Sequence, residues 1–307
     1  MRNDSPVFIV GSGRCGTSML LRIINKYTSI AIPAESHFIP RFKKVISEYE
    51  PLEDDDNIFK LLLDIKNYPY VRDWDFSFNE NDIFKRINHR TYSGVIEAIY
   101  TAYALQRNKV RWGDKTPPYL SCMSELYQLF PDAKFIHIIR DGRDCSLSVI
   151  QCVWGPMNLY KAAFWWKNGM IRGRKQLEIL KSVHSDIDNF YLEVRYEDIL
   201  LDPNHWLKVI FEFIGERFDS KILDDFEFKT NNIYKWKEYL SDHEKKLFEN
   251  IAGDLLSAYD YDCMICCNGN IPSVYKIYYS IDNKIRSLKN LLWDCKRKLY
   301  NKMYIRN

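Results

Sequence analysis

The chain has 307 residues, of which 46% are hydrophobic and 28% are charged, so it is long enough for one large α/β domain with insertions or for two small domains. The net charge of +3 gives no indication of a nucleic-acid partner, and the absence of any run of 18 apolar residues predicts no membrane-spanning helix. The first apolar run begins near residue 7, which leaves no room for a signal peptide, and we therefore expect a cytoplasmic protein.

The first predicted elements are a strand, a glycine-rich loop and a helix. The apolar run over residues 7–10 is typical of a buried parallel strand, and the turn Gly11–Gly16 follows it. An apolar segment with helical spacing extends over about 16–27. Backbone N–H groups at the N-terminus of such a helix can face an anion, and glycines allow a close approach, so this segment predicts a phosphate-binding loop.

The loop departs from the Walker A motif at one position. The spacing Gly11-x4-Gly16 matches that motif, but Thr17 stands where the motif has its lysine, and the cation lies inside the loop at Arg14. This pattern argues against ATP hydrolysis and favours another phosphate-bearing donor.

The segment after the first helix is predicted to be mostly helical. Ile30–Ile32 is interpreted as a short second strand. Residues 41–107 show helical periodicity interrupted at Pro51 and Pro69, and nothing in them indicates a sheet. We interpret them as a helical insertion over the strand ends, on the acceptor side, with its clearest helix over 93–106.

Two further buried strands are expected, at Phe135–Ile139 and Phe190–Val194. Helices are expected over about 120–130, from about 145, over 204–215 and over 241–257. Strands that alternate with helices predict an α/β fold, with a doubly wound parallel sheet of the P-loop NTPase type. Ligands bind at the carboxyl ends of such strands, and these ends carry Gly11–Ser18, Arg140–Ser148 and Tyr196.

The end of the chain is predicted to be a basic amphipathic helix. Residues 271–307 hold nine Lys or Arg residues against Asp282 and Asp294, which gives about +7 and leaves about −4 for the rest. Apolar residues recur there at alternating spacings of four and three: Ile281, Ile285, Leu288, Leu292, Cys295 and Leu299. The stripe fits packing on the protein's own domain, a homodimer seam or an anionic membrane surface. The predicted division is a domain over 1–270 and a tail over 271–307.

The cysteine pattern gives no indication of a metal site. Several of the eight cysteines stand in core-like or helix-like contexts, which suits a reducing compartment. The cluster Cys263-x2-Cys266-Cys267 lacks a second ligand pair at zinc spacing, so we expect no metal there.

Two motifs outside the first loop carry cations. Arg140 follows a predicted strand and Ser148 lies two turns into the next helix, so the two can jointly hold a second phosphate. Lys115 stands in the sequence Asp114-Lys115-Thr116-Pro117, where paired prolines fix a rigid turn.

With these motifs in order, the chain resembles the sulfotransferases that use 3′-phosphoadenosine 5′-phosphosulfate (PAPS). The 5′-phosphosulfate loop of that family is similar to Gly13–Ser18, and its 3′-phosphate motif is similar to Arg140–Ser148. The stretch Val194–Pro203 resembles the Y-E-D-L segment of the family, and Lys235 with the residues up to Tyr261 resembles its C-terminal part. The resemblance covers about residues 5–262.

The resemblance implies a set of donor contacts. The loop residues that would hold the 5′-phosphosulfate are Arg14, Cys15, Gly16, Thr17 and Ser18. Arg140 and Ser148 would hold the 3′-phosphate, Tyr196 would lie near the adenine or the 3′-phosphate, and Lys235 would close over the donor. The expected small-molecule partners are PAPS and its product PAP, with no nucleic acid.

Within the family, the tyrosylprotein and carbohydrate branch shows the closest pattern. The segment Pro33–Arg41 is similar to the stretch in which tyrosylprotein sulfotransferases carry their catalytic glutamate, which implies Glu35 as the base. The cytosolic small-molecule branch has a lysine and a histidine where this chain has Arg14 and Pro117. Tyrosylprotein enzymes also have an arginine where this chain has Cys152, so that contact is expected to be missing.

The chemistry of sulfuryl transfer assigns roles to these side chains. Negative charge builds on the bridging oxygen of the leaving group, so cations aimed at that oxygen, Arg14 and Lys115, stabilise the transition state. A hydroxyl is a poor nucleophile and needs a base, so we expect partial burial to raise the pKa of Glu35 toward neutrality. Arginine and lysine neutralise the charge, so no metal is expected. His37 is the alternative base.

Two acidic residues next to the second motif are expected to be structural. Asp141 and Asp144 are predicted to brace Arg140 and Arg143 rather than to take part in chemistry.

The function predicted from the sequence is sulfuryl transfer from PAPS to a hydroxyl group, of a carbohydrate or a glycolipid. A tyrosine in a peptide is the alternative acceptor. Two readings from other classes are a P-loop kinase or NTPase, which would have the Walker lysine, and a nucleotide-binding module without catalysis. The sequence of the insertion 41–107 does not identify the acceptor.

Overall fold

The computed structural model describes residues 5–264 and 271–304, with side chains described up to residue 289. The chain divides into two compact units. The sheet unit comprises Met1–Ile139 and Arg172–Thr230, and the helical unit comprises Arg140–Ile171 and Asn231–Asn307. The predicted boundary at residue 270, between a domain and a C-terminal tail, does not coincide with a limit of either unit and stays a prediction.

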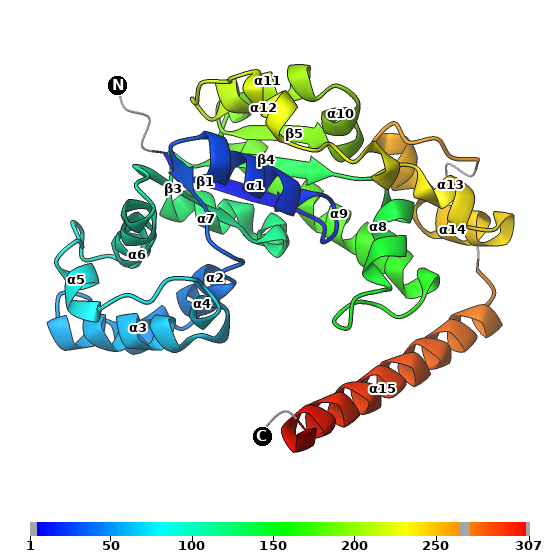
Figure 1. Cartoon of the computed structure of the whole chain (residues 1–307), viewed down its shortest axis with the longest axis horizontal. Coiled ribbons are helices and arrows are strands. Elements are labelled where there is room, and N and C mark those ends of the chain that lie inside the picture. The colour runs from blue at the N-terminus through cyan, green and yellow to red at the C-terminus, as the bar shows by residue number, and fades with distance from the viewer. Residues whose placement is uncertain (1–4, 265–270, 305–307) are drawn as a thin grey trace. The chain divides into compact units, whose positions relative to one another are not determined.

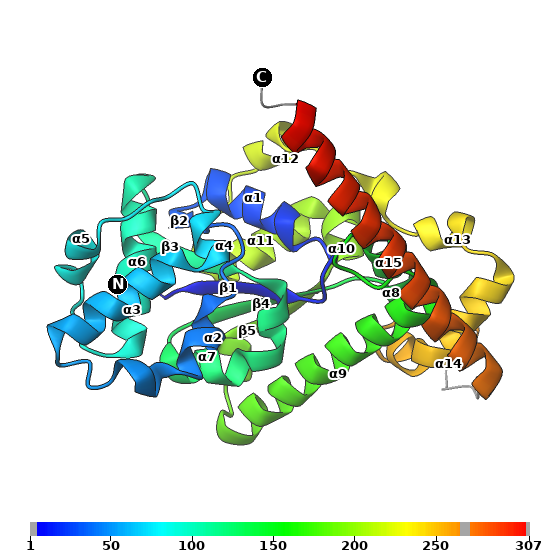
Figure 2. The same ribbon diagram turned by 90° about the horizontal axis from the view of Figure 1, so that it is seen from below.

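The sheet unit is built on five parallel strands in the order β2-β3-β1-β4-β5 (Figures 1 and 2). The strands are β1 (Val7–Gly11), β2 (Ile30–Ala31), β3 (Arg111–Lys115), β4 (Lys134–Ile139) and β5 (Tyr191–Arg195). Figure 1 shows α11 (Pro203–Phe213) above the strands and α7 (Met123–Leu129) below them. The predicted α/β fold with a parallel sheet is confirmed.

The helical insertion is also confirmed. Its elements are α2 (Phe38–Lys43), η1 (Ile46–Tyr49), α3 (Asp55–Asn67), α4 (Pro69–Arg72), α5 (Glu80–Phe84) and α6 (Tyr92–Gln106). The first of these begins at Phe38, before the predicted start at residue 41, because Phe38 and Ile39 are fully buried in the core. Asp54, Asn79 and Thr91 cap three of the helices with side-chain oxygens.

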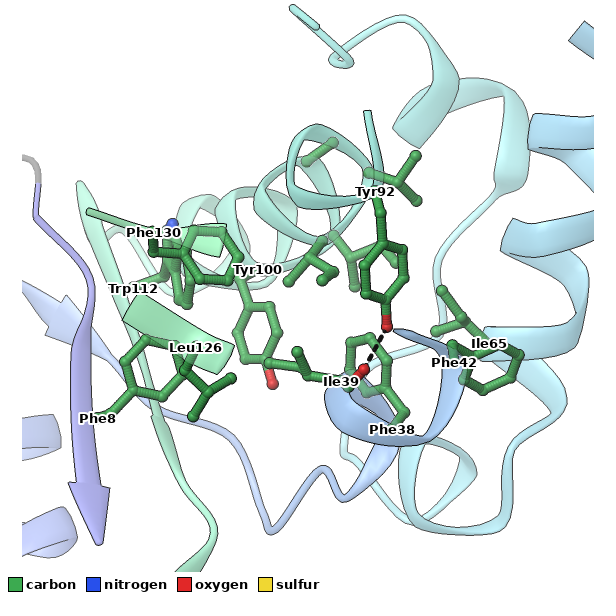
Figure 3. Close-up of a cluster of buried hydrophobic side chains, with 14 of the residues drawn as sticks. Phe8, Phe38, Ile39, Phe42, Ile65, Tyr92, Tyr100, Trp112, Leu126 and Phe130 are labelled. Atoms are coloured by element: carbon green, nitrogen blue, oxygen red, sulfur yellow. Dashed lines mark hydrogen bonds between the residues drawn. The ribbon is translucent and has the colours of Figure 1, made fainter. Parts of the chain in front are cut away.

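A buried aromatic cluster joins this insertion to the sheet (Figure 3). Tyr100 of α6 stacks on Trp112 of β3 with ring centroids 4.7 Å apart, and on Phe38 at 6.0 Å. The Tyr92 hydroxyl donates to the Ile39 carbonyl at 2.7 Å. Burying such rings stabilises a fold by about 1.5–3 kcal/mol each. The start of α2 is thereby fixed against the sheet, and so is the loop that precedes it.

The remaining elements of the sheet unit connect the strands. They are α1 (Thr17–Tyr27), η2 (Pro117–Cys122), α7, η3 (Ile187–Asn189), α10 (Tyr196–Leu201), α11, α12 (Lys221–Asp225) and η4 (Thr230–Asn232), the last of which ends in the helical unit. The predicted helix over 120–130 is in part the 3-10 helix η2, since Pro117 and Pro118 stand at its start.

The helical unit contains α8 (Gly142–Val149), α13 (Lys235–Tyr239), α14 (Asp242–Ala258) and α15 (Ser273–Tyr304), while α9 (Leu159–Val183) has residues in both units. Trp166 and Phe248 lie so close to Gly142 that a Cβ there would come within 2.4 and 2.7 Å of their rings. Asp141 accepts from the Arg143 N–H at 2.9 Å and so caps α8. For this reason α8 begins at Gly142 and not at the predicted Cys145.

Strand β3 and helix α9 are among the elements that were not predicted. Strand β3 has the sequence RWGDK, without an apolar run, yet all five residues are buried. Two of its charged residues have buried partners outside the strand: Arg111 pairs with Glu216 at 2.7 Å, and Asp114 accepts from the Tyr100 hydroxyl of α6. Helix α9 buries apolar residues at helical spacing, Leu159, Ala163, Trp166 and Met170, and this periodicity was not recognised in the sequence. Strand β5, predicted to be buried, lies at the edge of the sheet and is mostly half-exposed.

Some predictions concern residues that lie outside the described part of the chain. The stripe residues Leu292, Cys295 and Leu299 lie outside the described side chains, and Cys266 and Cys267 lie outside the described residues. Within the described part of the chain, no helix is both long and apolar enough to cross a membrane.

Candidate active site

The predicted site residues of the sheet unit lie at one end of the sheet, where the strands have their carboxyl ends. Gly11 ends β1, Lys115 ends β3, Tyr196 directly follows β5, and Glu35 lies shortly after β2. Because all strands are parallel, their carboxyl ends lie at the same end of the sheet, as the sequence predicted. Lys115 stands beside Ile9 in the register of β1 and β3, close to the start of the phosphate loop.

The phosphate loop has two residues in the left-handed region. Arg14 has φ 66° and Gly16 has φ 99°. Such turns direct successive N–H groups to one side and form a concavity for an anion. Gly16 is also the N-cap of α1 and has no side chain to satisfy the first N–H groups of the helix. Arg14 and Ser18 are exposed, so the loop presents a cation and a hydroxyl to solvent.

Tyr196 lies directly on this loop. A Cβ built on Gly16 would stand 2.2 Å from Cδ2 and 2.6 Å from Cε2 of the Tyr196 ring. Gly11 is under a similar constraint, since a Cβ there would come within 2.5 Å of Cys15 Sγ and 2.6 Å of the Ile138 carbonyl. Glycine is therefore required at both positions for the loop to close.

Glu35 and Lys115 form an ion pair. Lys115 Nζ donates to Glu35 Oε1 at 2.7 Å, and His37 Nε2 lies 3.1 Å from Glu35 Oε2. The Lys115 side chain is 7% exposed and that of Glu35 is 38% exposed. Each oxygen of the carboxylate therefore has a partner, and the pair is open to solvent on the side of Glu35.

The pKa of Glu35 is lowered, which contradicts the expected rise. Burial alone would raise the pKa of this carboxyl, but hydrogen bonds from His37 and Lys115 to the charged form outweigh it. The sequence could not show this, because Lys115 is far from Glu35 along the chain. The side chain is held ionised, and His37 orients it.

Buried hydrogen bonds hold the Glu35 loop on the end of β3. The Ser36 N–H donates to Thr116 Oγ1 at 2.9 Å, and the Ser36 and Tyr119 hydroxyls lie 2.7 Å apart. The Ile39 N–H donates to the Tyr119 hydroxyl at 3.1 Å. These groups were not predicted, and only the neighbouring Pro117 in the sequence marks the turn that places them.

Asp114, next to Lys115, is fully buried and accepts from the Tyr100 hydroxyl at 2.5 Å. Burial raises the pKa of Asp114, and hydrogen bonds oppose that rise only in part. Since Tyr100 belongs to the aromatic cluster, the end of β3 that carries Lys115 is tied to the core.

In the helical unit, Arg140 is anchored by two groups. Its Nη2 donates to the Asn232 carbonyl at 2.6 Å and lies 3.9 Å from Asp144 Oδ2. Asp144 in turn accepts from the Trp236 N–H at 2.9 Å, and burial raises the pKa of Asp144. The structure therefore brings the start of α8 together with the segment that contains Lys235.

Arg143 is one of the largest fully buried side chains. Its guanidinium donates to Asp141 at 3.0 and 2.8 Å and to Glu249 at 3.0 Å, and it lies 3.4 Å from the centre of the Trp236 ring. The prediction that Asp141 and Asp144 brace the two arginines is confirmed.

Ser148 and Lys235 are the other predicted contacts in the helical unit. Ser148 is half-buried on α8, and Lys235 is the half-buried first residue of α13. Cys152, where the tyrosylprotein enzymes have arginine, donates to the Ser148 carbonyl at 3.6 Å. Their roles toward a donor stay predictions.

The insertion contains a cavity of about 620 Å³. Its lining includes Lys43, Glu50, Arg90, Tyr92 and Leu129, and does not include Glu35. Over residues 5–264 and 271–289 no group of three His, Cys, Asp or Glu side chains is arranged to hold a metal ion.

Comparison with known proteins gives a consistent result. The family model described as "Sulfotransferase family" matches residues 6–220. A protein-tyrosine sulfotransferase of Drosophila melanogaster is 22% identical over 74% of this chain and 42% of that protein. The omega-hydroxy-beta-dihydromenaquinone-9 sulfotransferase Stf3 of Mycobacterium bovis is 23% identical over 84% of this chain and 76% of that protein. The chain spans about half the length of the tyrosine sulfotransferases that it matches.

Solved structures show the same fold. The sulfotransferase domain from the curacin biosynthetic pathway superimposes with a TM-score of 0.53 at 17% identity, covering 84% of this chain and 98% of that domain. The sulfotransferase domain from the Synechococcus PCC 7002 olefin synthase gives a TM-score of 0.50 at 20% identity, covering 85% and 98%.

Proposed function

The chain belongs to the sulfotransferase family, and we propose that it is an enzyme that moves a sulfuryl group from PAPS to an acceptor hydroxyl. The observation that carries this proposal is the ion pair between Lys115 and Glu35, 2.7 Å apart at the strand edge that also holds the phosphate loop. A cation and a carboxylate at that edge are the two groups that the reaction needs.

The loop residues fit a 5′-phosphosulfate. The left-handed turns at Arg14 and Gly16 direct N–H groups outward, and Thr17 and Ser18 add hydroxyls at the start of α1. Because the loop lacks the Walker lysine, the cations available to the bridging oxygen are Arg14 and Lys115. The Tyr196 ring packs on Gly16 and would lie beside the bound donor.

The helical unit would contribute the contacts to the 3′-phosphate. Arg140 would supply charge-assisted hydrogen bonds and Ser148 a neutral donor. Asp144 holds Arg140 from one side, so the guanidinium is oriented before any ligand arrives. Lys235 would close over the donor from the start of α13.

In the proposed reaction, Glu35 accepts the proton of the acceptor hydroxyl while the acceptor oxygen bonds to sulfur. The bond from sulfur to the bridging oxygen breaks in line, its electron pair stays on the phosphate, and PAP leaves. Lys115 would move from Glu35 toward the bridging oxygen, where charge develops. His37 would keep the carboxylate in position during that exchange.

For the acceptor we propose a hydroxyl of a carbohydrate or a glycolipid. The similar mycobacterial protein is named for an omega-hydroxylated menaquinone, a lipid that carries a hydroxyl group. A tyrosine in a peptide is the second candidate, because several similar proteins are protein-tyrosine sulfotransferases. We also propose a cytoplasmic location, because Cys15, Cys122 and Cys145 are buried in the core, which suits a reducing compartment.

The test is transfer of labelled sulfate from PAPS to a panel of glycans, glycolipids and tyrosine peptides. We expect transfer to a member of the first two groups and a higher melting temperature with PAP than with 5′-AMP. No transfer and no stabilisation by PAP would overturn the proposal. Stabilisation by Mg-ATP instead would indicate a kinase or NTPase, and binding of PAP with no transfer to any acceptor would indicate a module without catalysis.

A further inference from the structure

Helix α15 contacts the rest of the helical unit through its polar side. Asn158 Nδ2 donates to the Tyr279 carbonyl and to Asp282 Oδ2, each at 2.8 Å. The backbone N–H of the preceding residue donates to Asn283 Oδ1 at 2.8 Å. The Tyr279 ring also stacks on Tyr160, with centroids 5.1 Å apart. The side of the helix that holds it in place is therefore the one that carries Asp282 and Asn283.

The apolar residues of α15 lie on the other side and are exposed. Val274, Tyr278, Ile281, Ile285 and Leu288 are between 47% and 74% exposed. At about 100° per residue they fall on one stripe, roughly opposite the contacting side. An ordinary surface helix buries its apolar stripe and exposes its polar side. Helix α15 does the reverse, so its stripe does not stabilise the domain on which it lies.

Lysines border this stripe. Lys284 and Lys289 are exposed and, at about 100° per residue, fall on its two opposite edges. The segment 271–307 has a net charge of about +7 from nine basic and two acidic residues. One of the two acidic residues, Asp282, is already engaged by Asn158 and Arg286. The open side of the helix is thus apolar in the middle and cationic at its borders.

We propose that α15 docks the protein on an anionic lipid surface. The apolar stripe would enter the boundary between headgroups and acyl chains, and Lys284 and Lys289 would reach up to the phosphate groups. The exposed Tyr278 suits the same boundary, where an amphipathic ring has an apolar and a wet side. The contacts of Tyr279 and Asp282 leave the helix attached to the protein while the stripe is occupied.

A second copy of the helix fits the stripe less well than a membrane does. In a two-stranded coiled coil with Ile281, Ile285 and Leu288 as the seam, Lys284 and Lys289 would flank that seam. In a parallel pair, Lys284 of one copy would face Lys289 of the other, and in an antiparallel pair each lysine would face its own counterpart. These like charges oppose pairing, whereas anionic lipid attracts both.

The test is sedimentation of the full chain with vesicles, without donor or acceptor, so its outcome is separate from that of the proposed transfer. We expect binding to phosphatidylcholine vesicles with about 30% phosphatidylglycerol, weaker binding at high salt, and little binding to phosphatidylcholine alone. The variant Ile281→Glu/Ile285→Glu/Leu288→Glu should bind at least about tenfold more weakly, and Lys284→Glu/Lys289→Glu likewise.

Matched controls change equally exposed residues elsewhere. Val183→Glu/Leu201→Glu replaces exposed apolar side chains outside α15, and Lys85→Glu/Lys208→Glu replaces exposed lysines. Both should bind vesicles like the wild type, and unchanged melting curves establish that the α15 variants fold. Equal losses in controls and α15 variants, or no binding to anionic vesicles by the folded wild type, would overturn the proposal. So would light scattering that shows a dimer which the triple glutamate variant dissociates.

Discussion

Lys115 Nζ lies 2.7 Å from Glu35 Oε1 and joins the end of β3 to the loop that follows β2. Lys115 is nearly buried, while the carboxylate is open to solvent on one side. The two groups proposed for catalysis therefore neutralise each other before any ligand binds. Under the proposed mechanism, the lysine exchanges its carboxylate partner for the leaving group, and the carboxylate is released to act on the acceptor.

Replacing Glu35 by Gln should lower kcat by about 10²–10⁴-fold, because the amide cannot accept the acceptor proton. The affinity for PAP should change little, since Glu35 has no proposed donor contact. Initial rates and a PAP titration measure the two effects. The control is Glu227→Gln, whose side chain is 78% exposed. A rate near that of the wild type would exclude Glu35 as the base.

The variant His37→Ala should shift the pH dependence of kcat/KM. Burial raises the pKa of Glu35, and hydrogen bonds from His37 and Lys115 bring it below its ordinary value. A base works only when ionised, so activity is lost as the pH falls through that lowered pKa. Loss of the His37 hydrogen bond raises the pKa, so the acid limb should move to higher pH. The exposed His243→Ala is the control, and an unmoved acid limb would contradict the role of His37.

Arg140→Ala should weaken PAP binding by about 10–100-fold, the range of one lost charge-assisted contact, and leave 5′-AMP binding unchanged. The difference between the two ligands isolates the 3′-phosphate. Calorimetric titration of both ligands measures it, with the exposed Lys237→Ala as the control in the same unit. Equal losses for PAP and 5′-AMP would contradict the proposed contact.

Arg143→Met should destabilise the protein by about 3–5 kcal/mol, because it leaves the buried Asp141 and Glu249 without their cation. The triple variant Arg143→Met/Asp141→Asn/Glu249→Gln should recover part of that loss, since no buried charge remains unpaired. Denaturant unfolding gives the free energies. A loss below about 1 kcal/mol for the single variant would show that the pairs are not coupled to folding.

Gly16→Ala should abolish PAP binding. Its φ of 99° is strained for alanine, and the new Cβ would stand 2.2 Å from the Tyr196 ring. Gly16→Ala should also lower the melting temperature. In the double variant Gly16→Ala/Tyr196→Ala the clash with the ring is removed but the backbone strain remains, so the melting temperature should recover only in part. Melting temperatures with and without PAP measure both effects. Wild-type PAP binding by Gly16→Ala would show that the loop does not use this turn.

Local patterns predicted the elements that carry their own signal. Strand β1 is an uninterrupted apolar run ended by glycine, and α14 begins at a complete capping box of Ser241 and Glu244. Strand β3 was missed because its burial depends on partners such as Glu216, which neutralises Arg111 from more than 100 residues away along the chain. No local pattern carries such information.

The sequence by itself determined the order of the motifs, the phosphate loop without its lysine and the identity of the candidate base, since each depends on residues that are neighbours in the chain. The tertiary structure decided that Glu35 is paired with Lys115 and that its pKa is lowered rather than raised. Those two residues are 80 positions apart, and they meet only because β2 and β3 are adjacent and parallel. The charge on a group depends on which groups lie near it in space, and strand order sets that.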